Sequence, residues 1–209
     1  MMKVTRSILL VILIVAIEQG AKLVVYNNFE IGNPELGKEY NTIHIHPFYN
    51  DDSMNSWNNN AIATGTSVGL WRVIEICGIL IKCAFVLYLI RCLYRSNIIA
   101  GANLWKEYVR ICTAICISIY ICRLSDVIFY GGKTLDYICF SVLFYDGAGR
   151  PVGGHYIYTL NDFYIYILIC LLSIYVMKTV ISFIKYLNSK KGDCKKEIYT
   201  SAAKYVFFK

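Results

Sequence analysis

Apolar residues gather into four long runs along the chain, and polar segments separate them. The runs cover about residues 7–26, 68–93, 108–130 and 162–184. Each is close to the roughly 20 residues that a helix needs to cross about 30 Å of hydrocarbon. Only helices and closed barrels satisfy their backbone hydrogen bonds in lipid, and these runs are too long and continuous for barrel strands. The pattern predicts an all-α membrane protein with four transmembrane helices.

The first run has the features of a secretory signal at its start. Lys3 and Arg6 precede the apolar residues 8–17. No cleavage site of small residues follows, however, and the chain continues through Glu18 and Lys22 into further apolar residues. We therefore expect this run to be retained as the first transmembrane helix.

Lysine and arginine residues concentrate in three places: the N-terminal tip, the segment between the second and third runs, and the C-terminal tail. With four spans these places share one side of the membrane, and the positive-inside rule assigns that side to the cytoplasm. Both termini are then cytoplasmic, and segments 27–67 and 131–161 lie outside. We expect a membrane domain at 1–185 and a basic cytoplasmic tail at 186–209 that contacts anionic headgroups.

The two outer segments carry strand-like sequence. Residues 41–49 and 135–144 are rich in β-branched and aromatic side chains. Asp146-Gly147 is typical of a hairpin turn and lies between the strand-like segments 141–144 and 155–160. These patterns predict a small β-rich extracytoplasmic cradle on the outer surface.

Composition excludes other classes of protein. Hydrophobic residues make up 57% of the chain and charged residues 17%, against about 25% charged in soluble domains. The net charge of +7 does not form one basic face, so we expect no nucleic-acid partner. Most of the nine cysteines lie inside apolar runs and lack zinc spacing, which indicates packing residues. His44 and His46 share a strand face but lack a third ligand, so we expect no metal.

Four acidic residues lie at or near membrane depth. Glu18 falls inside the first run, and Asp126, Asp136 and Asp162 fall at the outer boundary. Ionisable groups at this depth are costly and are therefore candidates for function. Two carboxylates near an apolar medium share a proton, because one pKa rises while the other group stays charged. Such a pair activates water and protonates a leaving amine, which is peptide hydrolysis by an aspartic dyad.

The same acids also have an ordinary structural interpretation. Asp162 precedes an apolar helix, where aspartate is a favoured N-cap, and Asp136 fits an exposed loop. The sequence does not show that the two side chains meet. A channel using Glu18 and Asp126 is a further alternative, which we rank last because the fourth run has no charge between Asp162 and Lys178.

Short motifs occur in a fixed order along the chain. They are Glu18-Gln19-Gly20-Ala21-Lys22, Pro47-Phe48-Tyr49-Asn50, Asn59-Asn60-Ala61-Ile62-Ala63-Thr64, Cys122-Arg123-Leu124-Ser125-Asp126-Val127, Leu135-Asp136-Tyr137 and Tyr158-Thr159-Leu160-Asn161-Asp162. In order and in membrane depth these motifs resemble those of the lipoprotein signal peptidase (type II signal peptidase) family. That family has four spans with both ends cytoplasmic.

The resemblance implies a membrane aspartic endopeptidase that cleaves signal peptides from prolipoproteins just before a diacylglyceryl-modified cysteine. It implies Asp136 and Asp162 as the catalytic dyad, no cofactor or metal, and a monomer in the bacterial inner membrane. Its partners would be the lipid-modified precursor and membrane lipid. It also implies a set of substrate-binding or positioning residues, namely Asn59, Lys22, Asn161, Thr159, Asp126 and Arg123.

The chain departs from the family pattern around the third and fourth runs. Arg123 and Val127 replace the family asparagine and arginine on either side of Asp126, and Thr159 stands where asparagine is expected. These changes leave a second interpretation open: a catalytically inactive relative that binds lipoprotein precursors or a membrane partner.

Overall fold

The structure of the protein is a computed structural model that describes residues 2–29, 31, 42–99 and 106–189. Its elements follow the order α1 (Met2–Asn28), β1 (Thr42–Asn50), α2 (Asp52–Thr64), α3 (Val68–Ile99), α4 (Lys106–Phe129), β2 (Thr134–Tyr145), β3 (Pro151–Tyr158) and α5 (Leu160–Ser189). Four of these helices, α1, α3, α4 and α5, are long and apolar enough to cross a membrane. They confirm the four predicted helical runs and indicate a multi-pass membrane protein.

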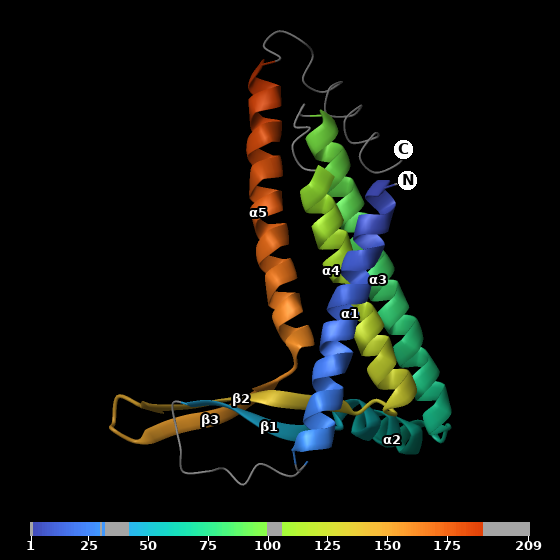
Figure 1. The fold of residues 1–209 in the computed structure, drawn as a ribbon, viewed down its shortest axis with the longest axis vertical. Coiled ribbons are helices and arrows are strands. Elements are labelled where there is room, and N and C mark those ends of the chain that lie inside the picture. Colours follow the sequence, from blue (N-terminus) through green and yellow to red (C-terminus); the bar gives the residue numbers. More distant parts are fainter. Residues whose placement is uncertain (1, 30, 32–41, 100–105, 190–209) are drawn as a thin grey trace.

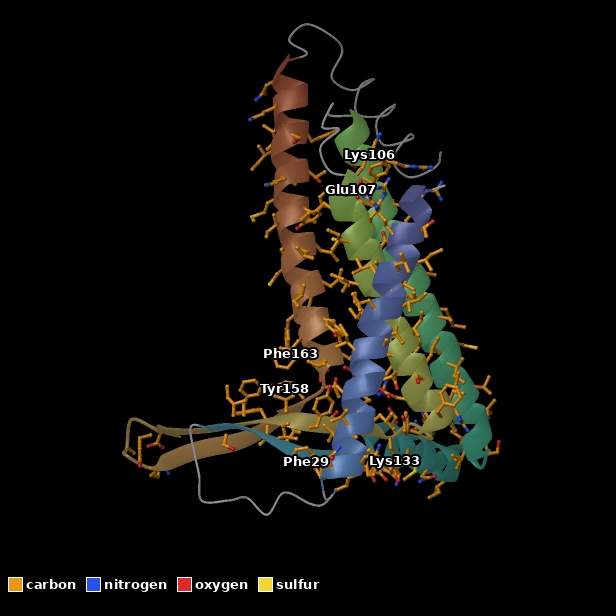
Figure 2. The ribbon with its side chains drawn as sticks, viewed as in Figure 1. Phe29, Lys106, Glu107, Lys133, Tyr158 and Phe163 are labelled. Atoms are coloured by element: carbon orange, nitrogen blue, oxygen red, sulfur yellow. The ribbon has the colours of Figure 1, made fainter. Side chains whose placement is uncertain are left out.

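The four long helices form a bundle whose two ends differ (Figure 1). Helix α1 begins and α5 ends at one end of the bundle, while α2 and the three strands lie at the other. Lys106 lies at the first end, and Phe29 and Lys133 lie at the sheet end (Figure 2). Helix α5 continues past the predicted domain boundary at 185 to Ser189, and the rest of the predicted basic tail lies outside the described residues.

Helix α4 is the central helix of the bundle. Half of its most apolar stretch is buried, whereas only 11–17% of the corresponding stretch is buried in each of the other three long helices. Small side chains on α4, including Cys112, Ala114, Cys116 and Ser118, are almost fully buried, which allows neighbouring helices to approach closely. The eight described cysteines are free thiols, in agreement with the packing role that the sequence indicated.

The strands form one antiparallel sheet in the order β1-β2-β3 that lies across the end of the bundle (Figure 1). The predicted hairpin is present, because the amide of Asp146 donates to the carbonyl of Arg150 at the turn between β2 and β3. Strand β3 ends at Tyr158 rather than at 160, because α5 already begins at Leu160.

Strand β1 contains a bulge next to the residue that pairs with Asp136 of β2. Ile45 pairs with Ile138, but Phe48 pairs with Asp136. Strand β1 therefore contains one more residue than β2 over this stretch. Pro47 lies in the bulge, where its missing N–H costs no ladder hydrogen bond. The shift brings the end of β1, at Asn50, alongside Asp136.

Helix α2 was not predicted. It is polar, with Trp57 and Ala61 as its buried residues, and therefore lacks the apolar stripe by which an amphipathic helix is recognised. Gly65 ends the helix in a left-handed conformation with φ of 65°. Trp57 packs with Ile79 of α3 and Val127 of α4, so this one side chain fixes α2 against the bundle.

Replacing Gly132 by alanine is expected to destabilise the fold more than the same change at Gly131. Both glycines have positive φ, at 84° and 64°, which costs an L-residue about 1–2 kcal/mol. A Cβ at Gly131 meets nothing, whereas a Cβ at Gly132 runs into the Trp57 ring, an overpacking that costs roughly 1–3 kcal/mol more. Thermal unfolding of both variants in detergent measures the difference. Equal Tm values would contradict this role of Trp57.

Candidate functional site

A cavity of about 800 Å³ lies between α3, α4, α5 and the sheet. Its lining changes from polar at the sheet end to apolar along the helices. The polar lining consists of Asn50, Glu75, Arg123, Asp126, Thr134, Asp136, Thr159, Asn161 and Asp162. The apolar lining includes Ile79, Val86, Ile119, Leu168 and Leu172. The cavity is therefore suited to a ligand with one polar and one apolar part.

Asp136 lies on β2 and is only 8% exposed. Its Oδ2 accepts a hydrogen bond of 3.3 Å from the Asn50 amide. Burial is the main cause that raises the pKa of Asp136 to about 7; the Asn50 hydrogen bond opposes this shift, and the charge of Asp162 adds to it. Near neutral pH this carboxyl therefore holds a proton for much of the time.

Asp162 is the third residue of α5 and belongs to a capping box. Its Oδ2 accepts hydrogen bonds from the Thr159 amide at 2.8 Å and from the Thr159 hydroxyl at 3.0 Å. The Asp162 amide donates back to the Thr159 hydroxyl at 3.3 Å. Thr159 is thus the N-cap, which corrects the expectation that Asp162 would hold that position. Within the described part of the chain no group donates to Oδ1, so this oxygen can bind water.

The two aspartates face the same cavity although they come from a strand and a helix. Both line it, and they interact, because the charge of Asp162 contributes to the raised pKa of Asp136. One carboxyl that holds a proton and one that accepts two hydrogen bonds through Oδ2 make up the asymmetry that acid–base hydrolysis uses.

Lys22 lies behind the cavity in a buried ion triad. Its ammonium is 2.7 Å from Asp126 Oδ1 and 3.2 Å from Glu18 Oε1, and all three side chains are at most 2% exposed. The triad joins α1 to α4, and only Asp126 reaches the cavity wall. Lys22 is therefore placed to hold Asp126 and does not line the cavity. A channel path through Glu18 and Asp126 gains no support, because Lys22 pairs with both.

Arg123 is held in a network that joins four elements. Its guanidinium donates to Thr134 at 2.9 Å, to Ser53 at 2.6 Å and to Glu75 at 3.0 Å. The Trp57 indole donates to the other oxygen of Glu75. Because Thr134 is two residues before Asp136, the network fixes the strand that carries the buried acid. Arg123 lines the cavity, and this network holds its guanidinium in place.

Ser53, Glu75 and Trp57 were not predicted to contribute to this region, and Asn50 was named only as the last residue of the Pro47-Phe48-Tyr49-Asn50 motif. An acidic residue inside an apolar run was the available signal for Glu75. The motif did not indicate that Asn50 contacts Asp136, because this contact depends on the register of β1 against β2.

The remaining predicted residues are divided between the cavity and the surface. Asn161 lines the cavity, and its side-chain oxygen is buried without a hydrogen-bond partner among the described residues. Asn59 lies on α2, is exposed, and does not line the cavity. The side chains of His44 and His46 fall outside the described part of the chain. Elsewhere in that part, no group of three or more metal-ligating side chains occurs.

Comparisons of the chain with family models, with characterised proteins and with solved structures gave no significant match. The geometry of the cavity and the order of the motifs are therefore what indicate a function.

Proposed function

We propose that the protein is a membrane aspartic endopeptidase that removes signal peptides from prolipoproteins, cutting just before a diacylglyceryl-modified cysteine. One observation carries the proposal: Asp136 and Asp162 line a single cavity at one end of an apolar bundle, and the pKa of Asp136 is raised to about 7. The order of the motifs supplies the class of substrate.

The two carboxyl groups take complementary parts in the reaction. Asp162 accepts a proton from water while the water oxygen attacks the scissile carbonyl carbon, and Asp136 donates its proton to the carbonyl oxygen. The resulting neutral diol collapses as the C–N bond breaks. The amine nitrogen takes the proton held by Asp162, and Asp136 recovers a proton from a diol hydroxyl. Both groups return to their starting states.

The separation of polar and apolar side chains along the cavity suits a peptide that is anchored in lipid. Its polar end offers the acids and Asn161 to the cleaved backbone, and its apolar end offers Ile119 and Leu168 to a membrane-embedded segment. We place the protein in the bacterial inner membrane as a monomer, with the site outside and the termini in the cytoplasm, as the lysine and arginine distribution predicts.

The test is cleavage by the purified full chain in lipid nanodiscs. A precursor peptide that carries a diacylglyceryl-modified cysteine is compared with the same peptide carrying a free thiol. Mass spectrometry is expected to show release of the signal segment from the modified peptide only, with the cut just before the cysteine. Equal cleavage of both peptides, or a cut elsewhere, would contradict the proposed specificity.

The pH dependence of cleavage follows from the protonation of Asp136. Because this group donates a proton and its pKa is raised to about 7, activity is present below that pH and is lost above it. A plot of log(kcat/KM) is expected to fall with a limiting slope of about −1 on the alkaline side. Activity that still rises above pH 8 would exclude Asp136 as the proton donor.

A second candidate is a relative that binds precursors without cleaving them. The Arg123 network favours it, because the guanidinium is anchored by Glu75, Ser53 and Thr134 and so holds the elements around Asp136 together. In the same nanodiscs this candidate predicts saturable binding of the modified precursor and no product. Measurable turnover would remove it.

A further inference from the structure

A second hollow, which we call the aromatic hollow, lies beside the cavity that holds the two aspartates. Its volume is about 350 Å³, and its lining residues are Phe140, Tyr156, Tyr158, Phe163 and Tyr166. Tyr158 lines the cavity as well, so the two spaces are neighbours. The proposed reaction makes no use of the aromatic hollow, and its position next to the dyad calls for an occupant.

The register of the sheet places the aromatic hollow on the same face as Asp136. Phe140 is four residues beyond Asp136 on β2, so the two side chains share a face and lie about 13 Å apart along the strand. Tyr156 of β3 pairs with Phe140 and adds its side chain to this face. Figure 2 shows Tyr158 and Phe163 on the side of the sheet where the helices lie. The hollow therefore lies where the sheet meets the membrane-spanning part of α5.

The walls of the aromatic hollow are rigid at its base and open at its edge. The ring of Phe140 lies 5.7 Å from that of Tyr158, and the Phe163 ring lies 6.0 Å from both. Tyr156 and Tyr166 remain 49% and 56% exposed and border the opening. Among the described residues, none forms a hydrogen bond with the tyrosine hydroxyls of the hollow. The hollow thus suits an apolar group that also carries hydrogen-bond acceptors, as at a lipid–water boundary.

The first turns of α5 separate the cavity from the aromatic hollow. Asp162 and Ile165 line the cavity, whereas Phe163 and Tyr166 line the hollow. Each residue of the second pair follows one of the first pair directly, which turns it by about 100° around the helix. A ligand whose reacting bond lies at Asp162 can therefore extend one apolar part along each of these two faces.

The proposed substrate has two apolar parts, one on either side of the cleaved bond. The signal segment precedes the bond, and the apolar end of the cavity accommodates it. The diacylglyceryl group is carried by the cysteine that follows the bond, so it leaves the acids in another direction. Its ester carbonyls accept hydrogen bonds, which tyrosine hydroxyls donate. At about 350 Å³ the hollow is at the lower end of the range for ligand pockets, enough for the glyceryl esters while the acyl chains continue into lipid.

We propose that the aromatic hollow binds the glyceryl ester part of the diacylglyceryl group on the cysteine after the cleaved bond. This inference rests on the proposed function, because it takes the lipid-modified precursor as the substrate. It assigns Tyr156 and Tyr166 as specificity residues that distinguish the modified cysteine from a free thiol. Bilayer phospholipids carry similar esters, but the sharing of Tyr158 with the dyad cavity favours the substrate as the occupant.

The first test is photocrosslinking in nanodiscs with a precursor that carries a diazirine next to one glyceryl ester. The full chain with Asp162→Asn is used, so that the precursor stays intact. Mass spectrometry is expected to find crosslinks on residues of the aromatic hollow, and excess unlabelled modified precursor, but not the thiol peptide, is expected to displace them. Crosslinks confined to the apolar end of the cavity would overturn the proposal.

Phosphatidylglycerol with the same diazirine is the comparison probe for bilayer lipid. It is expected to label the hollow less than the precursor does and to be displaced by the precursor. Equal labelling of the hollow that the precursor does not displace would assign the hollow to bilayer lipid and overturn the proposal.

The second test combines Tyr156→Ala with Tyr166→Ala, two changes at exposed positions that leave the base of the hollow in place. Affinity for the modified precursor, measured by energy transfer in the nanodisc, is expected to fall about tenfold, and affinity for the thiol peptide is expected to stay the same. Tyr145→Ala is the matched control, because Tyr145 is an exposed aromatic residue on the opposite face of β2, and it is expected to bind as wild type does.

Equal affinity of wild type and the double variant for the modified precursor would overturn the proposal. Crosslinking and affinity both report binding without turnover. A protein that binds the lipid group in the hollow but releases no product would refute the peptidase function alone, whereas cleavage without these binding effects would refute the lipid site alone.

Discussion

Replacing Asp136 or Asp162 by asparagine is expected to reduce cleavage of the lipid-modified precursor by at least about 10³-fold. Each change removes one proton-transfer group. The amide oxygen of Asp162→Asn can still accept the Thr159 hydrogen bonds that cap α5, so the helix start is retained. Initial rates of product release, with Tm measured in parallel, separate lost chemistry from lost fold.

Asp146→Asn is the matched control, because Asp146 is a carboxylate in the β2–β3 turn and lies outside the cavity. It is expected to cleave at the wild-type rate. Wild-type activity in either Asp136→Asn or Asp162→Asn would end the dyad interpretation.

Replacing Lys22 by methionine is expected to destabilise the protein by about 3–5 kcal/mol, the usual cost of leaving a buried charge without its partner. Glu18 and Asp126 are both almost fully buried, and Lys22 forms ion pairs with both. Urea-dependent or thermal unfolding in detergent measures the loss.

A triple variant that combines Lys22→Met with Glu18→Gln and Asp126→Asn removes all three charges and is expected to recover most of the stability. Arg150→Gln breaks an exposed ion pair with Asp146 and is expected to leave Tm unchanged. If Lys22→Met unfolds at the wild-type Tm, the triad does not hold α1 against α4.

The long helices were predictable because lipid acts as a local solvent. Each run of apolar residues reports its own environment, so residues 68–93 and 162–184 identified α3 and α5 without knowledge of their neighbours. The β2–β3 hairpin was predictable for a similar reason, since Asp146-Gly147 is a local turn signal.

Features that depend on distant parts of the chain were not predictable. The contact of Asn50 with Asp136 depends on a bulge in β1. The role of Glu75 depends on α2, a helix without an apolar stripe that brings Ser53 and Trp57 to it. The sequence showed that Arg123 departs from the pattern of the family that the chain resembles. Only the packing of four elements shows which residues this arginine contacts.

The central claim is that two carboxyl groups in one cavity hold one proton between them near neutral pH. Infrared difference spectroscopy of the purified protein, comparing wild type with Asp136→Asn, measures that proton through the carbonyl stretch of a protonated carboxyl. A band that disappears as pH rises through about 7 and is missing from Asp136→Asn is the predicted result. A wild type without this band at about pH 5, or a band that Asp136→Asn retains, would contradict the account.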